Sequence, residues 1–299
     1  MAEWMPDADQ RWRGAGRRAW VMVRSLVVLL TAGGAFACGS ETADSEGTRI
    51  ADVEATAGSA LEVNDAGVRV AGAGSLARAA GGEQGTDYRV QVITNPGVVI
   101  GAVGGGSSID TSITPTHDLS VCRPFSQSLV PSRNGGVGNA VVWLSGVSTG
   151  PRDDAPRRAK LTLDGCRLEP RVQRLAMGTT VLLNGRDAMM SRLQFTADGE
   201  REPRATALLS DVGQVVPIAT ASAAPGLVRV SDDMHPWVRA WLVVAPHPFV
   251  AVTDADGQFR FDGVPPGRYT LHVWHERFGT KEQKVRVESG VQVRVELGY

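Results

Sequence analysis

From residue 88 onward, short apolar runs recur at close intervals, and glycine, proline and aspartate separate them. Such runs are rich in β-branched residues and predict β-strands, whereas sustained helical spacing is scarce. The predicted strands before the C-terminal third are 88–92, 97–103, 140–144, 160–163, 180–183, 227–230 and 240–244. This spacing is typical of an all-β protein built from sandwiches.

The pattern is clearest in the C-terminal third. Residues 249–252 and 258–261 predict two strands of a hairpin joined by a turn at 253–257. Aspartate and glycine supply the local hydrogen bonds and the positive φ that such a turn needs. After a corner at 262–267, three further strands are predicted at 268–274, 282–287 and 291–295.

Residues 253–271 follow the string T-D-x-D-G-x-F-x-F-x-x-V-P-P-G-x-Y-x-L without interruption. This string resembles that of the carboxypeptidase regulatory-like, or prealbumin-like, β-sandwich. The resemblance implies two earlier strands, and the runs that fit them lie far upstream at 99–103 and 139–144. We therefore expect one prealbumin-like sandwich formed by 88–156 and 248–299.

The residues between these two parts, 157–247, resemble a plastocyanin-like cupredoxin. The supporting residues are 165–172, 178–181, Asn184, Asp187, 225–230 and the His-Pro-Trp at 235–237. The resemblance implies a Greek-key sandwich that is inserted in, or abuts, the prealbumin-like sandwich. Both sandwiches would follow a disordered N-terminal tether.

Copper-binding relatives carry a histidine after the Asn/Asp turn and a C-x-x-H-P-W-M string. The resemblance places their ligand positions at Ser191, Asp232, His235 and Val238, so that three of the four residue types differ from copper ligands. A trigonal site of two histidines and one thiolate is what selects copper and sets its redox behaviour. We therefore expect a degenerate copper site with no metal and no cofactor.

An alternative keeps the metal through a different set of donors. Met189, Met190, Met234 and His235 would form a soft site for Cu(I). The protein would then be a copper-binding electron-transfer or copper-handling protein. Against this, methionines beside a β core usually fill gaps in its packing.

The N-terminal region has the character of an export signal. Arg24 precedes the short apolar run 25–32, and small residues then lead to Cys38. A positive flank, a short apolar core and small residues predict a secretory signal, which is too short to span a membrane. The sequence Ala-Phe-Ala-Cys at 35–38 resembles a bacterial lipobox, which implies that Cys38 is lipidated. An ordinary signal cut before a free cysteine is the alternative.

We therefore expect a signal peptide at 1–37, although Met22 would also begin a signal of ordinary shape. Residues 38–87 are poor in aromatic residues and rich in Ala, Gly, Glu and Asp, which predicts a disordered tether. The mature protein is expected in the cell envelope, anchored to a membrane by its lipid and facing the periplasm or the cell surface.

Two further cysteines, Cys122 and Cys166, remain once Cys38 carries the lipid. An even pair in an exported protein predicts a disulfide. On the chain-entropy model, it would stabilise the fold by about 4 kcal/mol. A pair of metal thiolates is less attractive, because neither cysteine has a second ligand close by in sequence.

Composition and charge narrow the function. The formal net charge of −1 gives no electrostatic footprint for nucleic acid. No arrangement of nucleophile, base and acid can be recognised, so we expect no enzyme and no catalytic residue. A non-catalytic binding or structural module with an envelope protein or glycan partner remains, since the prealbumin-like class is often termed carbohydrate-binding-like by fold. Trp143, Trp241 and Trp274 lie in predicted strands and are expected in the core.

Overall fold

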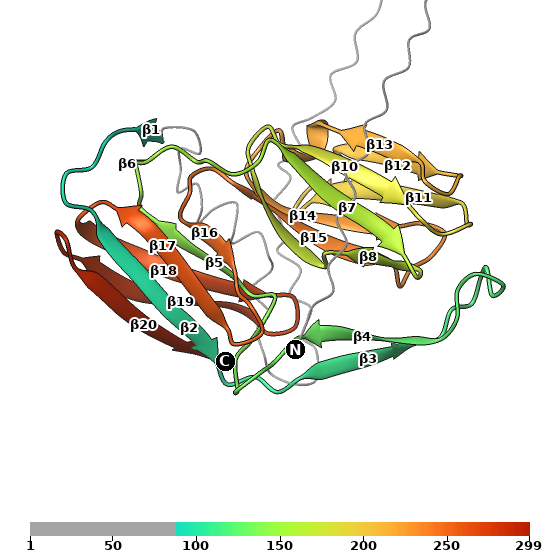
Figure 1. The fold of residues 1–299 in the computed structure, drawn as a ribbon, viewed down its shortest axis with the longest axis horizontal. Coiled ribbons are helices and arrows are strands. Elements are labelled where there is room, and N and C mark those ends of the chain that lie inside the picture. Colours follow the sequence, from blue (N-terminus) through green and yellow to red (C-terminus); the bar gives the residue numbers. More distant parts are fainter. Residues whose placement is uncertain (1–87) are drawn as a thin grey trace, which may run out of the picture. The chain divides into compact units, whose positions relative to one another are not determined.

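The computed structural model describes residues 88–299, which consist largely of β-strands and include one short 3-10 helix, η1 (Thr220–Ser222). The prediction of an all-β protein with one sandwich inserted in another is confirmed (Figure 1). The expected signal segment 1–37 and tether 38–87, together with Cys38, lie outside the described residues. Within the described range, no helix has the length and apolar character needed to cross a membrane.

The middle of the chain forms a two-sheet unit, here termed the inserted sandwich. Its first sheet has the strand order β13 (Val215–Ile218), β10 (Thr180–Gly185), β7 (Arg158–Asp164) and β8 (Arg167–Glu169). Its second sheet has the order β12 (Ala205–Leu209), β11 (Ser191–Ala197), β14 (Gly226–Asp232), β15 (Arg239–Ala245) and β9 (Val172–Ala176). Parallel pairing of β7 with β10 and of β9 with β15 adds two non-local contacts to this otherwise antiparallel unit.

Strands from both sides of this unit form the second one, here termed the split sandwich. One sheet has the order β16 (Val250–Val252), β5 (Val141–Ser145), β18 (Gly267–His275) and β19 (Gly279–Val287). The other has the order β17 (Gln258–Val264), β2 (Gly97–Gly104) and β20 (Gln292–Gly298). Two short strands, β1 (Arg89–Val90) and β6 (Thr149–Gly150), pair with each other in parallel. The last strand of the chain, β20, pairs in parallel with β2, which precedes the insertion.

The prediction that the strands on either side of the turn 253–257 pair with each other as a hairpin is wrong. The turn is present, but β16 pairs with β5 in one sheet and β17 pairs with β2 in the other. The chain thus crosses between the two layers at this turn. Local sequence specifies the turn, whereas the pairing depends on strands contributed by distant segments.

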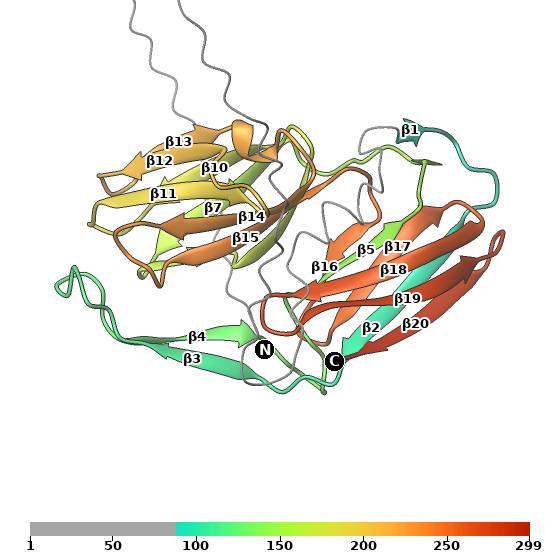
Figure 2. The ribbon, with the colours of Figure 1, turned by 180° about the vertical axis from the view of Figure 1, so that it is seen from behind.

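Besides the two sandwiches, the chain forms a separate hairpin that the sequence analysis did not predict. The strands β3 (Ile109–Ile113) and β4 (Phe125–Val130) pair only with each other and form a two-stranded sheet of their own (Figure 2). The hairpin 109–130 is here termed the arm. Val121 and Phe125 of the arm pack against the core of the inserted sandwich. The arm therefore connects the split sandwich, in which its two ends originate, with the inserted sandwich.

Strand β15 shows why some runs are apolar at every position. Ala240, Leu242 and Val244 belong to the core of the inserted sandwich, whereas Val243 and Ala245 belong to a separate cluster on the opposite face. Side chains alternate between the faces of a strand, so a continuous apolar run indicates that both faces are covered. Here the second face packs on the split sandwich.

This second cluster joins the two sandwiches. Its members are Val141, Trp143, Val172, Leu227, Val243, Ala245, Val250 and Trp274. They come from β5, β16 and β18 of the split sandwich and from β9, β14 and β15 of the inserted sandwich. The joint is thus a continuous apolar contact between two sheet faces.

An ion pair closes one side of this joint. Arg171 donates to both carboxylate oxygens of Glu276, over 2.6 and 2.8 Å, and the two side chains are only 9% and 11% exposed. The Trp241 indole donates a third hydrogen bond to Glu276, over 3.0 Å, and its ring meets Trp274 edge-on. Burial raises the pKa of Glu276, but Arg171 and Trp241 outweigh burial and hold that pKa below its ordinary value. Trp143, Trp241 and Trp274 therefore all pack in the joint between the two sandwiches.

We predict that Arg171→Met lowers the free energy of unfolding by about 3–5 kcal/mol, because it leaves the buried Glu276 carboxylate without its cation. The matched control is Arg286→Met, which removes an arginine from an exposed pair with Glu288. The control variant is expected to unfold at the denaturant concentration of the wild type. Equal shifts of the two urea midpoints would contradict this assignment.

Candidate functional site

The four positions that the resemblance assigns to copper ligands lie on β11, at the end of β14 and in the loop that follows it. Ser191 begins β11 and Asp232 ends β14, while His235 and Val238 lie in the loop between β14 and β15. They are 0%, 3%, 0% and 0% exposed in that order. The predicted positions thus form a buried group, and the chemistry of this group follows from how its polar atoms are bonded.

Asp232 organises the loop that follows it. One carboxylate oxygen accepts a hydrogen bond from the Met234 amide, over 2.9 Å, and another from the Arg192 amide of β11, over 3.2 Å. The other oxygen lies 2.8 Å from Nδ1 of His235. An aspartate that bonds the backbone two residues later is a common turn device. The carboxylate therefore fixes the loop and orients the imidazole.

The second imidazole nitrogen meets a residue that sequence reasoning missed. Nε2 of His235 lies 2.7 Å from a carboxylate oxygen of Asp118, which belongs to the loop of the arm and is 117 residues away in sequence. No strand was predicted near Asp118. The one available signal was Cys122, because its predicted disulfide to Cys166 already tied this segment to the inserted sandwich.

The two carboxylates decide the protonation of His235. An ionised carboxylate only accepts hydrogen bonds, so each ring nitrogen must carry a proton when it contacts one. Burial, the largest single effect, lowers the pKa of His235, but the bonds and charges of Asp118 and Asp232 together raise it above the ordinary 6.5. These contacts therefore favour the protonated form of the buried His235 ring between the two carboxylates. Asp118, His235 and Asp232 are here termed the clamp.

The geometry of the clamp does not suit a metal ion. The two carboxylates contact opposite nitrogens of the ring, so the three side chains cannot converge on one ion. Among residues 88–299, no group of three or more His, Cys, Asp or Glu side chains is arranged to hold a metal. The Ser191 hydroxyl has no hydrogen-bond partner in the described part of the chain, and Val238 belongs to the apolar core. The residues present therefore do not fit copper at the positions named by the resemblance.

The predicted disulfide between Cys122 and Cys166 is present. Cys166 and Gly165 both have a φ of +61° and form the tight turn between β7 and β8. The Asp187 carboxylate accepts hydrogen bonds from the Gly165 and Cys166 amides, over 2.9 and 2.8 Å respectively. The thioether sulfur of Met189 lies 3.4 Å from the Cys122 sulfur and packs on the bridge.

The alternative thioether site is not assembled. Met189 is buried against the disulfide, whereas Met190 and Met234 are 52% and 42% exposed. These side chains and the clamped His235 do not share one buried site. Met189 fills space beside the bridge, as methionines often do in β cores.

A second polar group was also missed from sequence. The Ser145 hydroxyl lies 2.8 Å from Nε2 of His272, and Nδ1 of His272 lies 3.5 Å from Glu282. Burial lowers the pKa of His272, whose ring stacks on Trp143. The contact to Glu282 is too long for a hydrogen bond, and that carboxylate is 65% exposed. We therefore interpret the group as cross-strand polar contacts, and the expectation of a non-enzyme stays a prediction.

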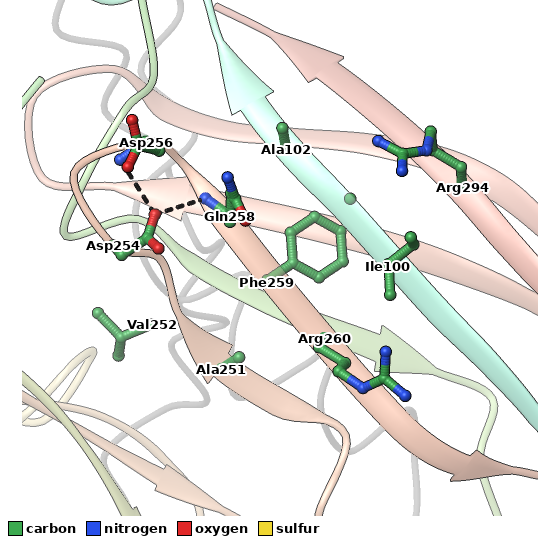
Figure 3. A pocket seen from close by; sticks show the side chains of 11 residues that line it. Ile100, Ala102, Ala251, Val252, Asp254, Asp256, Gln258, Phe259, Arg260 and Arg294 are labelled. Carbon is green, nitrogen blue, oxygen red and sulfur yellow. Dashed lines mark hydrogen bonds between the residues drawn. The ribbon is translucent and has the colours of Figure 1, made fainter. Parts of the chain in front are cut away.

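The split sandwich carries an open cleft of about 750 Å³ beside the turn between β16 and β17. Arg260 and Arg294 flank Ile100 on three neighbouring strands of this cleft (Figure 3). At its end, an Asp254 carboxylate oxygen accepts hydrogen bonds from the Asp256 and Gln258 amides, over 3.0 and 2.9 Å. The cleft thus combines a structured turn with apolar and cationic side chains.

Comparison with known proteins gives one family match. Residues 226–298 match the carboxypeptidase regulatory-like domain. The matched range includes β14 and β15 of the inserted sandwich as well as β16 to β20 of the split sandwich. The C-terminal part of the chain is therefore similar to a carboxypeptidase regulatory-like domain. No curated protein matches the chain.

Several solved copper proteins are similar to part of the chain. A copper-containing nitrite reductase from Thermus scotoductus is 20% identical over 30% of this chain and 23% of its own, with a TM-score of 0.26. A purple cupredoxin from Nitrosopumilus maritimus is 16% identical over 29% of this chain and 99% of its own, with a TM-score of 0.25. Amicyanin from Paracoccus versutus is 15% identical over 30% of this chain and 85% of its own, with a TM-score of 0.26. These likenesses assign no activity to this chain.

We predict that Asp232→Ala destabilises the protein by about 3–5 kcal/mol, because it removes the buried anion that faces a buried cation. The neighbouring Asp233 offers a matched control, since it pairs with the exposed Arg192. Asp233→Ala is expected to cost no more than about 1 kcal/mol. Urea denaturation of both variants checks the difference, and similar losses would show that Asp232 carries no special charge contact.

Proposed function

We propose that the protein is a non-catalytic, lipid-anchored envelope protein whose two sandwiches act as one binding or structural module. The clamp is the observation that carries this proposal. It engages two of the positions at which a copper protein has its ligands, Asp232 and His235, in hydrogen bonds within the chain. The apolar joint between the sandwiches supports the second part of the proposal, because it favours a rigid two-sandwich unit over two independent domains.

Electron transfer through copper is the function that this arrangement argues against. Asp232 stands where the thiolate would be, and Val238 stands where the axial thioether would be. His235 has both nitrogens engaged by carboxylates, so it has no free lone pair for a metal. Without sulfur donors, the inserted sandwich keeps a scaffold and loses the features that tune a blue-copper site.

The sequence around Cys38 supports the proposed attachment to a membrane. The lipobox-like residues 35–38 and the tether 38–87 would place the two sandwiches at a distance from the lipid surface. A diacylated cysteine would anchor the protein stably, because two acyl chains in the bilayer bind firmly whereas a single acyl chain binds only weakly. The protein would then face the periplasm or the cell surface.

The partner would be an envelope protein or a glycan. The cleft beside the turn 253–257 is a place on the split sandwich where one could bind. Its apolar floor at Ile100 and its flanking Arg260 and Arg294 would suit a ligand with both apolar and polar groups.

A copper titration of the purified full-length protein tests the first part of this proposal. We expect neither Cu(II) nor Cu(I) to remain bound after dialysis against a competing chelator, because the clamp leaves no convergent donors. Amicyanin, which has been solved in its Cu(I) form, serves as the positive control for copper retention. One equivalent of copper retained by the wild type would contradict the proposal.

Membrane attachment is tested separately with Cys38→Ala. We expect the wild type to fractionate with membranes and to incorporate labelled fatty acid, and the variant to lose both properties. Glu41, Asp44 and Glu46 lie just beyond Cys38 and need not be changed, so only the lipidated sulfur differs between the two proteins. Equal membrane association of wild type and variant would rule out Cys38 as the anchor.

A further inference from the structure

We propose that the loop 114–121 of the arm is a pH-sensitive latch, which protonated His235 holds on the inserted sandwich and which opens when this proton is lost. The Cys122–Cys166 disulfide keeps the arm attached in both states. The latch goes beyond the proposed function and depends on neither the membrane anchor nor the partner. It follows from the contacts that hold the loop in place.

Asp118 links the shape of the loop to its attachment. Its carboxylate contacts His235, while its backbone carbonyl accepts hydrogen bonds from the Val121 and Cys122 amides, both over 2.8 Å. Its φ of +50° lies in the left-handed region, which is costly for most residues. Leu119 at the tip of the loop is 60% exposed. The charged contact is therefore the main polar attachment of the loop between β3 and the disulfide.

Loss of one proton breaks one side of the clamp. A neutral imidazole has a single N–H, so one nitrogen would then direct its lone pair at a carboxylate oxygen. Asp232 is held by two backbone amides, and its side chain is fully buried. The Asp118 side chain is 41% exposed and can exchange its contact for water. The Asp118 side is therefore the one that opens.

The other charges near the ring do not replace this contact. Asp233 accepts a 2.6 Å hydrogen bond from Arg192, so that the two charges offset each other. His117 precedes Asp118 but is exposed and contacts Thr116. Asp118 and Asp232 are thus the charged groups that face His235 directly.

The direction of the pH dependence follows from these groups. Burial lowers the pKa of His235, whereas the two carboxylates raise it. The carboxylates have the larger combined effect, so the pKa lies above the ordinary value of 6.5. A group whose pKa is raised on folding stabilises the folded form below its unfolded pKa, and this stabilisation is lost as pH rises through the folded value. The latch is therefore closed in acid and opens on the alkaline side.

Amide hydrogen exchange of the full-length protein tests the latch, measured on a peptide covering 114–121 from about pH 6 to about pH 9. The informative variant is Asp118→Asn, because an amide side chain can either donate to or accept from the imidazole. It keeps a contact in both protonation states. Comparing the two proteins at each pH removes the intrinsic pH dependence of exchange.

We expect the wild type to be protected at least as well as Asp118→Asn at the acidic end. At the alkaline end, its protection should fall roughly tenfold below that of the variant, as expected for the loss of a single hydrogen bond. Asp110→Asn removes an exposed charge from the same arm without touching His235, and it should follow the wild type at every pH.

A wild-type to Asp118→Asn ratio that stays constant across this range would overturn the latch. The same holds if Asp110→Asn shifts the profile as Asp118→Asn does, because a general charge effect would then explain the change. The variant His117→Gln tests whether the other nearby histidine, which lies in the loop itself, causes the pH dependence. Loss of the pH dependence in that variant would assign the effect to His117 and reject the role of His235.

Discussion

The buried charge on His235 constrains both the inserted sandwich and the arm. An imidazole placed between two carboxylates must be a cation if both contacts are hydrogen bonds, and a cation without solvent must keep at least one anion close by. Asp232 meets this need from within the loop and shapes the loop through backbone amides. Asp118, in a segment distant in sequence, supplies the second carboxylate next to the imidazole. One proton thus connects the loop between β14 and β15 with the arm.

Two different kinds of contact hold the sandwiches and the arm together. The joint between the sheet faces is apolar, with Arg171 and Glu276 closing its side. The arm also packs on the inserted sandwich through Val121 and Phe125, but its loop is held in addition by the disulfide and by the charged contact to His235. Apolar joints and disulfides respond little to pH, whereas a charged contact through histidine does. This difference explains why the tip of the arm is the place where the fold is open to regulation.

Much of the architecture could be predicted because it depends on local pattern. The string at 253–271 specifies its turn and two of its strands, and an even pair of cysteines in an exported chain indicates the disulfide. Pairing could not be predicted, because β16 and β17 are neighbours in sequence but find their partners in β5 and β2. The arm was missed because β3 and β4 are short and rich in serine and threonine. Asp118 was missed for the same reason, since only the path of the arm brings it to His235.

The protonation of His235 is the central claim, and nitrogen NMR of the imidazole tests it most directly. With ¹⁵N-labelled histidine and His235→Gln to assign the signals, the account predicts that both ring nitrogens of His235 keep a directly bonded proton up to a higher pH than those of a free imidazole. A ring that loses its second proton at or below the pH at which a free imidazole does so would contradict the account, because its two contacts to carboxylates would then not favour the cation.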